Sequence, residues 1–170
     1  MKTGGIGIGL ILASAASLAP AQGFYAAATA GLMDADIDGY DPATNAGVLL
    51  GYEFFRREIV YLSAEAEFTT TLSDGDLDHG GRSGHWDIDS RAAYLAARVG
   101  ERFYLKVRYG VSWTDVGTRF EGRSRSSSDS SGSWGGALGF NFSDHWGVQA
   151  DGVLVDPDVT YWNLGAVYRF

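Results

Sequence analysis

Apolar and polar residues alternate along much of this chain, in short stretches that are typical of β-strands. In the clearest stretch, 103–114, every second residue from Phe103 to Trp113 is apolar, and the residues between them include Lys106 and Arg108. A period of two places neighbouring side chains on opposite faces of a strand. Eight stretches of ten to twelve residues follow this pattern, a length close to the roughly nine to eleven residues of a tilted strand that crosses a bilayer. They lie near 23–32, 46–55, 59–70, 88–99, 103–114, 133–142, 146–155 and 160–170.

The connections between these stretches are of two kinds. Tight turns are expected at 55–58, 100–102 and 143–145. Long polar loops rich in Gly, Asp and Ser are expected at 33–45, 71–87 and 115–132, with a shorter loop at 156–159. Short turns at one end and long loops at the other are typical of outer-membrane barrels. The pattern therefore predicts an all-β fold, an eight-stranded antiparallel up-and-down transmembrane β-barrel.

Charged residues on the polar faces indicate which face meets lipid. Four are acidic and four are basic: Glu53, Glu65, Glu67, Asp151, Arg98, Lys106, Arg108 and Arg169. We expect these balanced charges to pair inside a narrow polar lumen, because each cation would cost about 2–4 kcal/mol at the lipid midplane. A closed barrel also leaves no strand edge unpaired. The alternative is a soluble sheet whose charged face is exposed to water.

Aromatic residues on the apolar faces favour the membrane barrel over the soluble sheet. Toward the short turns lie Phe54, Phe103, Phe142, Trp146 and Phe170, and toward the long loops lie Phe68, Trp113, Trp134 and Trp162. Phe103 and Trp113 are ten residues apart. For a strand tilted by roughly 40°, that separation spans about 25 Å along the membrane normal, the height of the apolar band between two aromatic girdles. A soluble protein would place such residues in a core.

The first 21 residues have the features of a secretory signal peptide. Lys2 gives a positive start, an uncharged and mostly apolar stretch follows, and Ala19-Pro20-Ala21 offers the small residues of a cleavage site. We predict that 1–21 is removed and that 22–170 forms the barrel domain. A retained membrane helix is the alternative, but the apolar run is short and is interrupted by a proline and several glycines.

Composition excludes several classes of partner and cofactor. The chain has 170 residues and a formal net charge of −8, which argues against a nucleic-acid partner because phosphate binding needs a basic face. Without cysteine there is no disulfide framework and no thiolate metal site. We expect no cofactor.

One acidic stretch begins like a calcium-binding loop. Asp34, Asp36 and Asp38, followed by Gly39, have the spacing that starts an EF-hand loop, but Asn45 occupies the position of its bidentate Glu. The stretch is also flanked by predicted strands rather than helices. We therefore expect an acidic solvated loop and no structured metal site.

The C-terminal residues bring in a family resemblance. Asn163, Gly165, Tyr168 and the terminal Phe170 look like the β-signal by which the outer-membrane assembly machinery recognises its clients. With the exported N-terminus, 22–170 resembles the small eight-stranded outer-membrane β-barrel family of OmpA-like, OmpX-like and opacity-type proteins. The resemblance implies a monomer in the outer membrane of a Gram-negative cell. Its implied partners are lipid, lipopolysaccharide, the barrel-assembly machinery and a surface ligand bound through extracellular loops.

Three roles follow from this resemblance. The first is a structural or surface-interaction role, with the charged lumen largely plugged by side chains. The alternative is a porin-like channel. It would be narrow, because an eight-stranded interior is nearly filled by side chains. A third is a lipid A-modifying enzyme, because some barrels of this size are deacylases or palmitoyl transferases. His79, His85 and His145 lie in a loop or a turn, and none is paired with a serine at strand spacing. We therefore expect no enzyme activity and no catalytic residue.

Overall fold

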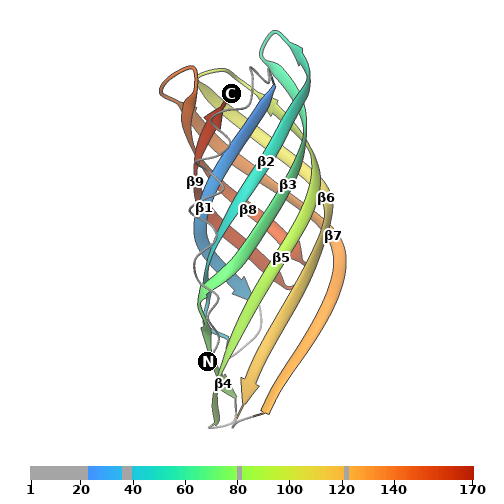
Figure 1. Ribbon diagram of the computed structural model, residues 1–170, viewed down its shortest axis with the longest axis vertical. Coiled ribbons are helices and arrows are strands. Elements are labelled where there is room, and N and C mark those ends of the chain that lie inside the picture. The colour runs from blue at the N-terminus through green and yellow to red at the C-terminus, as the bar shows by residue number, and fades with distance from the viewer. Residues whose placement is uncertain (1–22, 36–39, 80–81, 121–122) are drawn as a thin grey trace.

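The computed structural model describes residues 23–35, 40–79, 82–120 and 123–170, which form an antiparallel β-structure (Figure 1). Its strands are β1 (Phe24–Ala35), β2 (Ala43–Arg57), β3 (Val60–Ser73), β4 (Gly75–His79), β5 (Arg82–Val99), β6 (Phe103–Phe120), β7 (Arg123–Asn141), β8 (Trp146–Asp156) and β9 (Val159–Arg169). Within these residues, no helix is long and apolar enough to span a membrane. The predicted signal peptide, 1–21, lies outside the described residues and remains a prediction.

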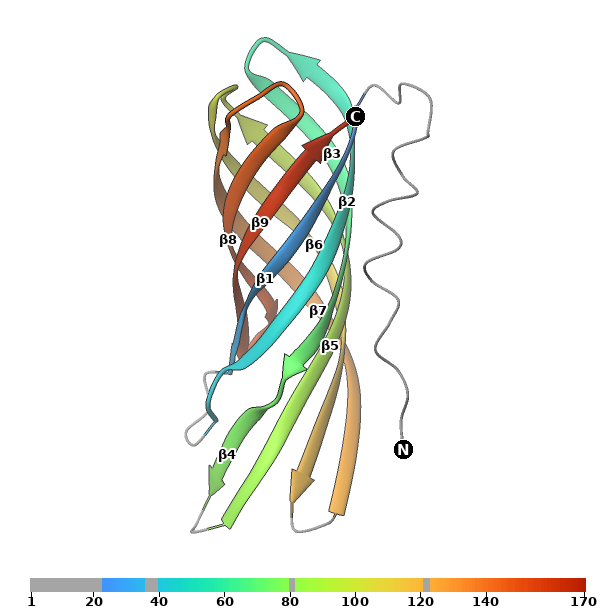
Figure 2. The ribbon, with the colours of Figure 1, turned by 60° about the vertical axis from the view of Figure 1, so that its left-hand side comes forward.

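Hydrogen bonding between neighbouring strands closes the sheet into a barrel. The strand order is β3-β2-β1-β9-β8-β7-β6-β5-β4, and an additional antiparallel pairing of β3 with β5 joins the two ends. The first and last strands lie side by side, because β1 pairs with β9 along its length. β4 follows β3 after a break at Asp74 and pairs with the outer part of β5 (Figure 2). The wall therefore has eight strands, which confirms the predicted fold class.

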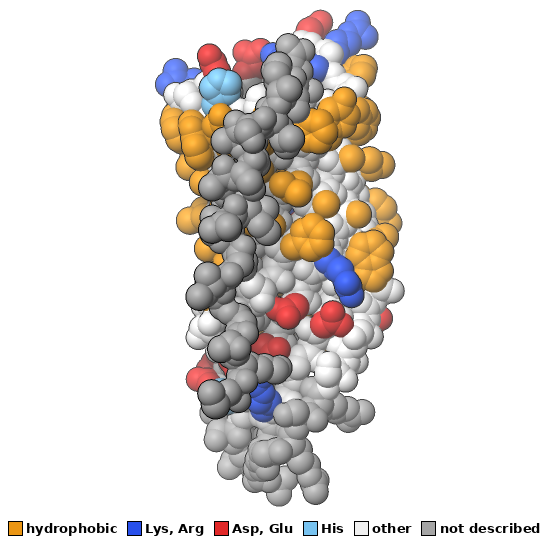
Figure 3. All heavy atoms as spheres, viewed as in Figure 1, with side chains coloured by type: hydrophobic (Ala, Val, Ile, Leu, Met, Phe, Trp, Pro, Cys, Tyr) orange, Lys and Arg blue, Asp and Glu red, His pale blue; other side chains and the backbone are white. Residues whose placement is uncertain are grey.

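Side chains alternate between the lumen and the outer surface as the sequence predicts. On β6, Lys106 and Arg108 are each 3% exposed, whereas Leu105 and Tyr109 on the outer face are 55% and 71% exposed. The same outward face carries the exposed aromatics Phe54, Phe68, Phe103, Trp113, Trp134, Phe142, Trp146 and Trp162. Figure 3 shows hydrophobic side chains gathered in a band, with charged side chains above the band and below it.

Three strands are much longer than the hydrophobic pattern predicts. β5, β6 and β7 continue through residues assigned from the sequence to long loops at 71–87 and 115–132, and β4 lies there too. The loop prediction was therefore wrong over most of these two ranges. Apolar alternation stops where lipid stops, but pairing continues beyond that point because each strand still satisfies the backbone groups of its neighbour. The extensions project past the rest of the wall (Figure 2).

The lumen is not polar throughout, contrary to the sequence-based expectation. Toward the end that carries the extensions, buried apolar side chains from β1, β5, β8 and β9 pack into one cluster. We call six of them the apolar septum: Met33, Trp86, Ile88, Val153, Val155 and Tyr161. β5 and β9 are four positions apart around the eight-stranded wall, so this cluster reaches across the lumen from one side to the other.

Candidate functional site

Five of the eight predicted lumen charges form one group, called here the central cluster: Glu65, Glu67, Lys106, Arg108 and Asp151. The Arg108 guanidinium lies 2.8 Å from Glu67 and 3.6 Å from both Glu65 and Asp151. The Lys106 ammonium lies 2.9 Å from Glu65 and 4.0 Å from Asp151. Each of these side chains is at most 4% exposed. Neighbouring inward positions on β3 and β6, with one on β8, bring the charges together.

Hydrogen-bond geometry in the central cluster is incomplete. Among the described residues, all three guanidinium nitrogens of Arg108 and one oxygen each of Glu65, Glu67 and Asp151 are buried without a hydrogen-bond partner. Asn163, one of the predicted β-signal residues, is 5% exposed, and neither its amide oxygen nor its amide nitrogen is hydrogen-bonded. Arg108 and the three carboxylates therefore attract each other mainly as opposite charges, with few directed hydrogen bonds between them.

The other three predicted lumen charges lie nearer the short turns and form a separate mouth group: Glu53, Arg98 and Arg169. The Arg98 guanidinium is 2.8 Å from the Glu53 carboxylate. Arg169 instead donates a hydrogen bond of 2.6 Å to the side-chain oxygen of Asn141. Both guanidinium groups face the ring of Tyr104, at 5.1 Å for Arg98 and 5.7 Å for Arg169.

The eight charges therefore balance over the whole lumen but not within each group. The central cluster has three acids and two bases, whereas the mouth group has one acid and two bases. A neutral layer lies between them. Tyr104 donates a hydrogen bond of 3.0 Å to Gln149, and Gln149 donates one of 2.7 Å to Asp151. The alternation in the sequence predicts that all eight side chains face the lumen. It does not predict that they separate into a central cluster and a mouth group of opposite net charge.

The extensions of β5, β6 and β7, together with β4, form a second candidate site, which we call the projecting sheet. β7 pairs with β6 up to Arg123, whereas its pairing with β8 ends at Trp134. In the described residues, the backbone of 123–130 therefore has a strand partner on the β6 side alone. The side chains of 126–130, four serines and an aspartate, are exposed. This segment is a free, polar sheet edge.

One arginine lies among the aromatic residues on the outer surface. Arg91 is the cross-strand partner of Phe68 on β3 and of Trp113 on β6. Its side chain is 63% exposed and lies 3.7 Å from Asp115. The guanidinium is thus positioned at the outer aromatic girdle, where an arginine can reach lipid head groups.

The predicted β-signal residues lie at the seam that closes the barrel. Asn163 and Gly165 face the lumen from β9, whereas Tyr168 lies outward with its ring 4.8 Å from Trp146 and 5.1 Å from Phe170. Their role in assembly remains a prediction.

The weaker candidates from the sequence do not converge. Asn45 is buried in β2 and donates a hydrogen bond to the Ile88 carbonyl, so it does not belong to a loop. Asp36, Asp38 and Gly39 lie outside the described residues, and no potential metal-binding group of three His, Cys, Asp or Glu side chains occurs in the part described.

The described histidine contacts contain no serine. His85 lies 3.0 Å from Asp76, and His145 lies 2.9 Å from the Arg169 carbonyl. The geometry offers no activated nucleophile among the residues described.

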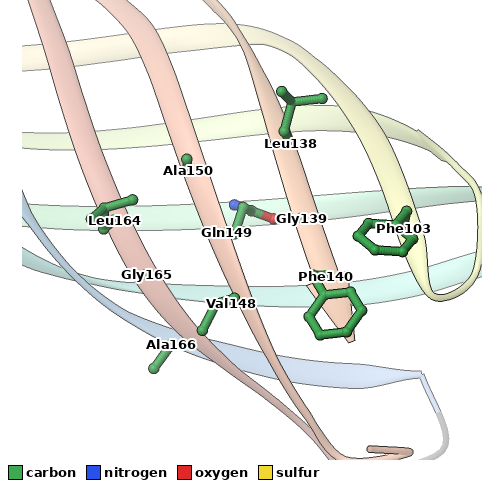
Figure 4. A pocket seen from close by; sticks show the side chains of 10 residues that line it. All are labelled: Phe103, Leu138, Gly139, Phe140, Val148, Gln149, Ala150, Leu164, Gly165 and Ala166. Carbon is green, nitrogen blue, oxygen red and sulfur yellow. The ribbon is translucent and has the colours of Figure 1, made fainter. Parts of the chain in front are cut away.

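One apolar groove lies on the lipid-facing surface. Its volume is about 560 Å³, and the ten residues that line it include Phe103, Leu138, Phe140 and Leu164 (Figure 4). Small residues such as Ala150 leave the hollow between these larger side chains. The groove has no charged residue in its lining, so it is separate from the two charged groups of the lumen.

Comparison with known proteins identifies the family. The model of the outer membrane protein beta-barrel domain matches residues 6–170. The chain belongs to this outer-membrane β-barrel family. It is accordingly a protein of the outer membrane and a member of the small eight-stranded group that its C-terminal motif indicates. No curated protein sequence matches this barrel.

Solved structures are similar to the barrel in fold. Ail, the attachment invasion locus protein of Yersinia pestis, has a TM-score of 0.60 at 22% identity, covering 88% of this chain and 99% of Ail. Neisserial surface protein A has a TM-score of 0.56 at 13% identity, with 88% and 98% coverage. The N-terminal barrel of Pseudomonas aeruginosa OprF has a TM-score of 0.54 at 15% identity, again with 88% and 98% coverage.

Proposed function

We propose that this outer-membrane barrel is a surface-interaction protein whose binding element is the projecting sheet. Outer-membrane barrels have short periplasmic turns and longer extracellular connections. The projecting sheet, at the end opposite the short turns, is therefore extracellular. The single observation that carries the proposal is the free edge of β7 at 123–130.

A free edge is a template for another strand. Its unpaired N–H and C=O groups can add an extended polypeptide segment, with affinity from backbone hydrogen bonds. Five of the eight residues at 123–130 are serines, and the three consecutive serines at 126–128 are small and uncharged, so they leave the backbone there accessible. The charged residues of this edge are Arg123, Arg125 and Asp129. Proteins that avoid such pairing protect their edges with lysine, proline or a covering loop. We infer that the partner is a polypeptide with an exposed extended segment.

The lumen supports this role better than it supports conduction. The apolar septum spans the extracellular half, and the central cluster fills the middle with buried, mutually attracted side chains. Because these side chains would obstruct ion flow, a narrow channel is the second candidate. The observation that favours it is the set of charged side chains in the lumen. The absence of an activated serine among the described histidine contacts gives no support for lipid A chemistry.

Two further partners belong to this proposal. Arg91, at the outer girdle, is positioned for the phosphates of lipopolysaccharide. The C-terminal residues from Asn163 to Phe170 would be read by the barrel-assembly machinery, and the protein would act as a monomer.

Shortening the sheet tests the proposal. Asp115 and Ser128 are cross-strand partners, so residues 116–127 can be replaced by an Asn-Gly turn that keeps the β6–β7 pairs below them. The replacement also removes the β6 partners of β5 at 84–88. Cells that display the full protein should adhere to immobilised, reduced and alkylated lysozyme, which presents extended segments. The shortened variant should lose at least tenfold of that adhesion.

A matched control separates the edge from its side chains. Ser126→Thr and Ser127→Thr in the full-length sheet keep the backbone edge, and adhesion should stay within twofold. Equal adhesion of the full and shortened proteins, with both present at the cell surface, would contradict the proposal.

A further inference from the structure

The periplasmic mouth of the lumen contains a cavity that none of the roles above uses. Its volume is about 580 Å³, and it is lined by four arginines, Arg56, Arg98, Arg102 and Arg169, and by the carboxylates of Glu53, Glu101 and Asp144. Arg56 and Arg102 stand at its rim, exposed to solvent. Arg98 and Arg169 form its inner wall together with Tyr61 and Asn141.

Arg98 and Arg169 differ in how their charges are neutralised. Arg98, with its side chain 9% exposed, has the Glu53 carboxylate at 2.8 Å and the ring of Tyr61 at 3.8 Å. Around Arg169, no carboxylate among the described residues lies within the 4.0 Å of an ion pair. Its Nε atom is buried without an acceptor in the same part of the chain. The two guanidinium charges also repel each other.

No nearby acid in the described part of the chain neutralises Arg169. Of the acids in the cavity lining, Glu53 is paired with Arg98, and neither Glu101 nor Asp144 forms an ion pair with Arg169. Glu65, Glu67 and Asp151 are held by Lys106 and Arg108 in the central cluster. The neutral layer of Tyr104 and Gln149 lies between that cluster and the mouth. The mouth group therefore keeps one excess positive charge beside a cavity large enough for a small ion.

We propose that this cavity binds a small oxyanion, with Arg169 as its main ligand and Arg98 as a second. A guanidinium presents parallel N–H donors that match the oxygens of a phosphate or a carboxylate. Arg169 lines the cavity, and its buried Nε donor has no acceptor of its own among the described residues. Because the apolar septum lies at the other end of the lumen, the anion enters from the periplasmic side.

Inorganic phosphate is the probe for the first test. The protein is folded in octyl glucoside micelles, which contain no phosphate, and the arginine Nε–Hε signals are followed by NMR at constant ionic strength. The Arg169 signal should shift saturably with phosphate, whereas the signal of Arg57, exposed at the end of β2 outside the cavity lining, should not. No saturable shift, or equal shifts of both signals, would overturn the proposal.

Variants give a second, independent readout. Arg169→Gln should weaken phosphate binding at least tenfold by calorimetry, whereas Arg57→Gln, which removes the same charge from the same end, should stay within twofold. Arg169→Lys keeps the charge without the planar fork and should lie between them. Equal weakening by Arg57→Gln would show a general charge effect and overturn the site.

Nanodiscs of phosphatidylglycerol then distinguish two sources of the oxyanion. If phosphate binds more weakly there than in glucoside micelles, a lipid head group competes for the site and is its natural occupant. If the affinities agree, the occupant is a free oxyanion of the periplasm. Both results support the site, because each requires saturable binding that depends on Arg169.

Discussion

The central cluster makes a specific prediction for the stability of the barrel. Replacing Arg108 with methionine removes the cation that lies between Glu67, Glu65 and Asp151. Lys106 still holds Glu65 at 2.9 Å, but Glu67 loses its 2.8 Å partner. The variant therefore has three buried acids and a single base.

Burial sets the size of the effect. Breaking a buried ion pair by removing one partner costs about 3–5 kcal/mol, because the remaining charge stays desolvated. At about 1.4 kcal/mol for each factor of ten, the unfolding equilibrium should change by roughly a hundredfold to several thousandfold. Arg119 is the matched control on the same strand. It also faces two carboxylates, at 3.6 and 4.0 Å, but it is 61% exposed. Arg119→Met should cost about 0–1 kcal/mol.

Equilibrium unfolding in urea of protein refolded into lipid vesicles measures these differences, with tryptophan fluorescence as the signal and linear extrapolation to water. The double variant Arg108→Met with Glu67→Leu should recover most of the loss, because replacing both partners by apolar residues is often close to neutral. A cost for Arg108→Met no larger than that for Arg119→Met would refute the reasoning. It would mean that the lumen screens charge as effectively as the surface does.

Three further predictions concern closure, the septum and strand packing. Unboiled protein should migrate differently from boiled protein on a detergent gel, because the closed wall resists detergent until heated, and identical mobility would argue against closure. Trp86→Ala should cost about 3–5 kcal/mol in urea unfolding, clearly more than Trp86→Phe, since its indole is 1% exposed within the septum, and equal costs for the two variants would refute close packing around the indole. Gly110→Ala should cost about 1–3 kcal/mol in urea unfolding, because its Cβ would lie 1.9 Å from the Ala93 carbonyl oxygen. Gly132→Ala, with open space around it, should stay within about 0.5 kcal/mol, and equal costs would contradict this packing.

The membrane-spanning part of the fold could be predicted because lipid imposes a strong rule on sequence. Each strand must alternate where one face meets hydrocarbon, and the face from Phe103 to Trp113 on β6 does so without a break. The same rule places Lys106 and Arg108 in the lumen on the sequence pattern alone. Outside the lipid, no comparable rule applies.

The projecting sheet was missed for this reason. Residues 123–133 contain only serine, glycine and charged residues, which is a composition typical of loops. What makes this segment a strand is its pairing with β6, a contact that the local sequence does not encode. The only available signal was the β-branched and aromatic content of its partner, with Val116, Thr118 and Phe120 at alternate positions.

The sequence does not predict the septum, because the side chains that face the lumen are charged in one part and apolar in another. Inward positions were recognised by their charges, so inward residues without charge, such as Ile88 and Val153, had no distinguishing mark. An apolar residue that faces the interior of a barrel and one that faces lipid satisfy the same local pattern. Only the closed wall shows that these side chains meet one another across the lumen.

The strands extend to unequal heights, so the barrel is asymmetric around its axis. β7 runs on for 11 residues beyond its last cross-strand pair with β8, from 133 to 123. At 3.3 Å per residue and roughly 40° of tilt, that extension rises by about 28 Å, which is close to the thickness of the hydrocarbon layer itself. The β8–β9 side, in contrast, turns back at Asp156 close to the lipid. A molecule that approaches from the β7 side thus meets a wall that stands well above the membrane, whereas one that approaches from the β8–β9 side meets a wall that ends close to it. The orientation of the barrel about the membrane normal therefore determines which of the two a neighbouring protein contacts.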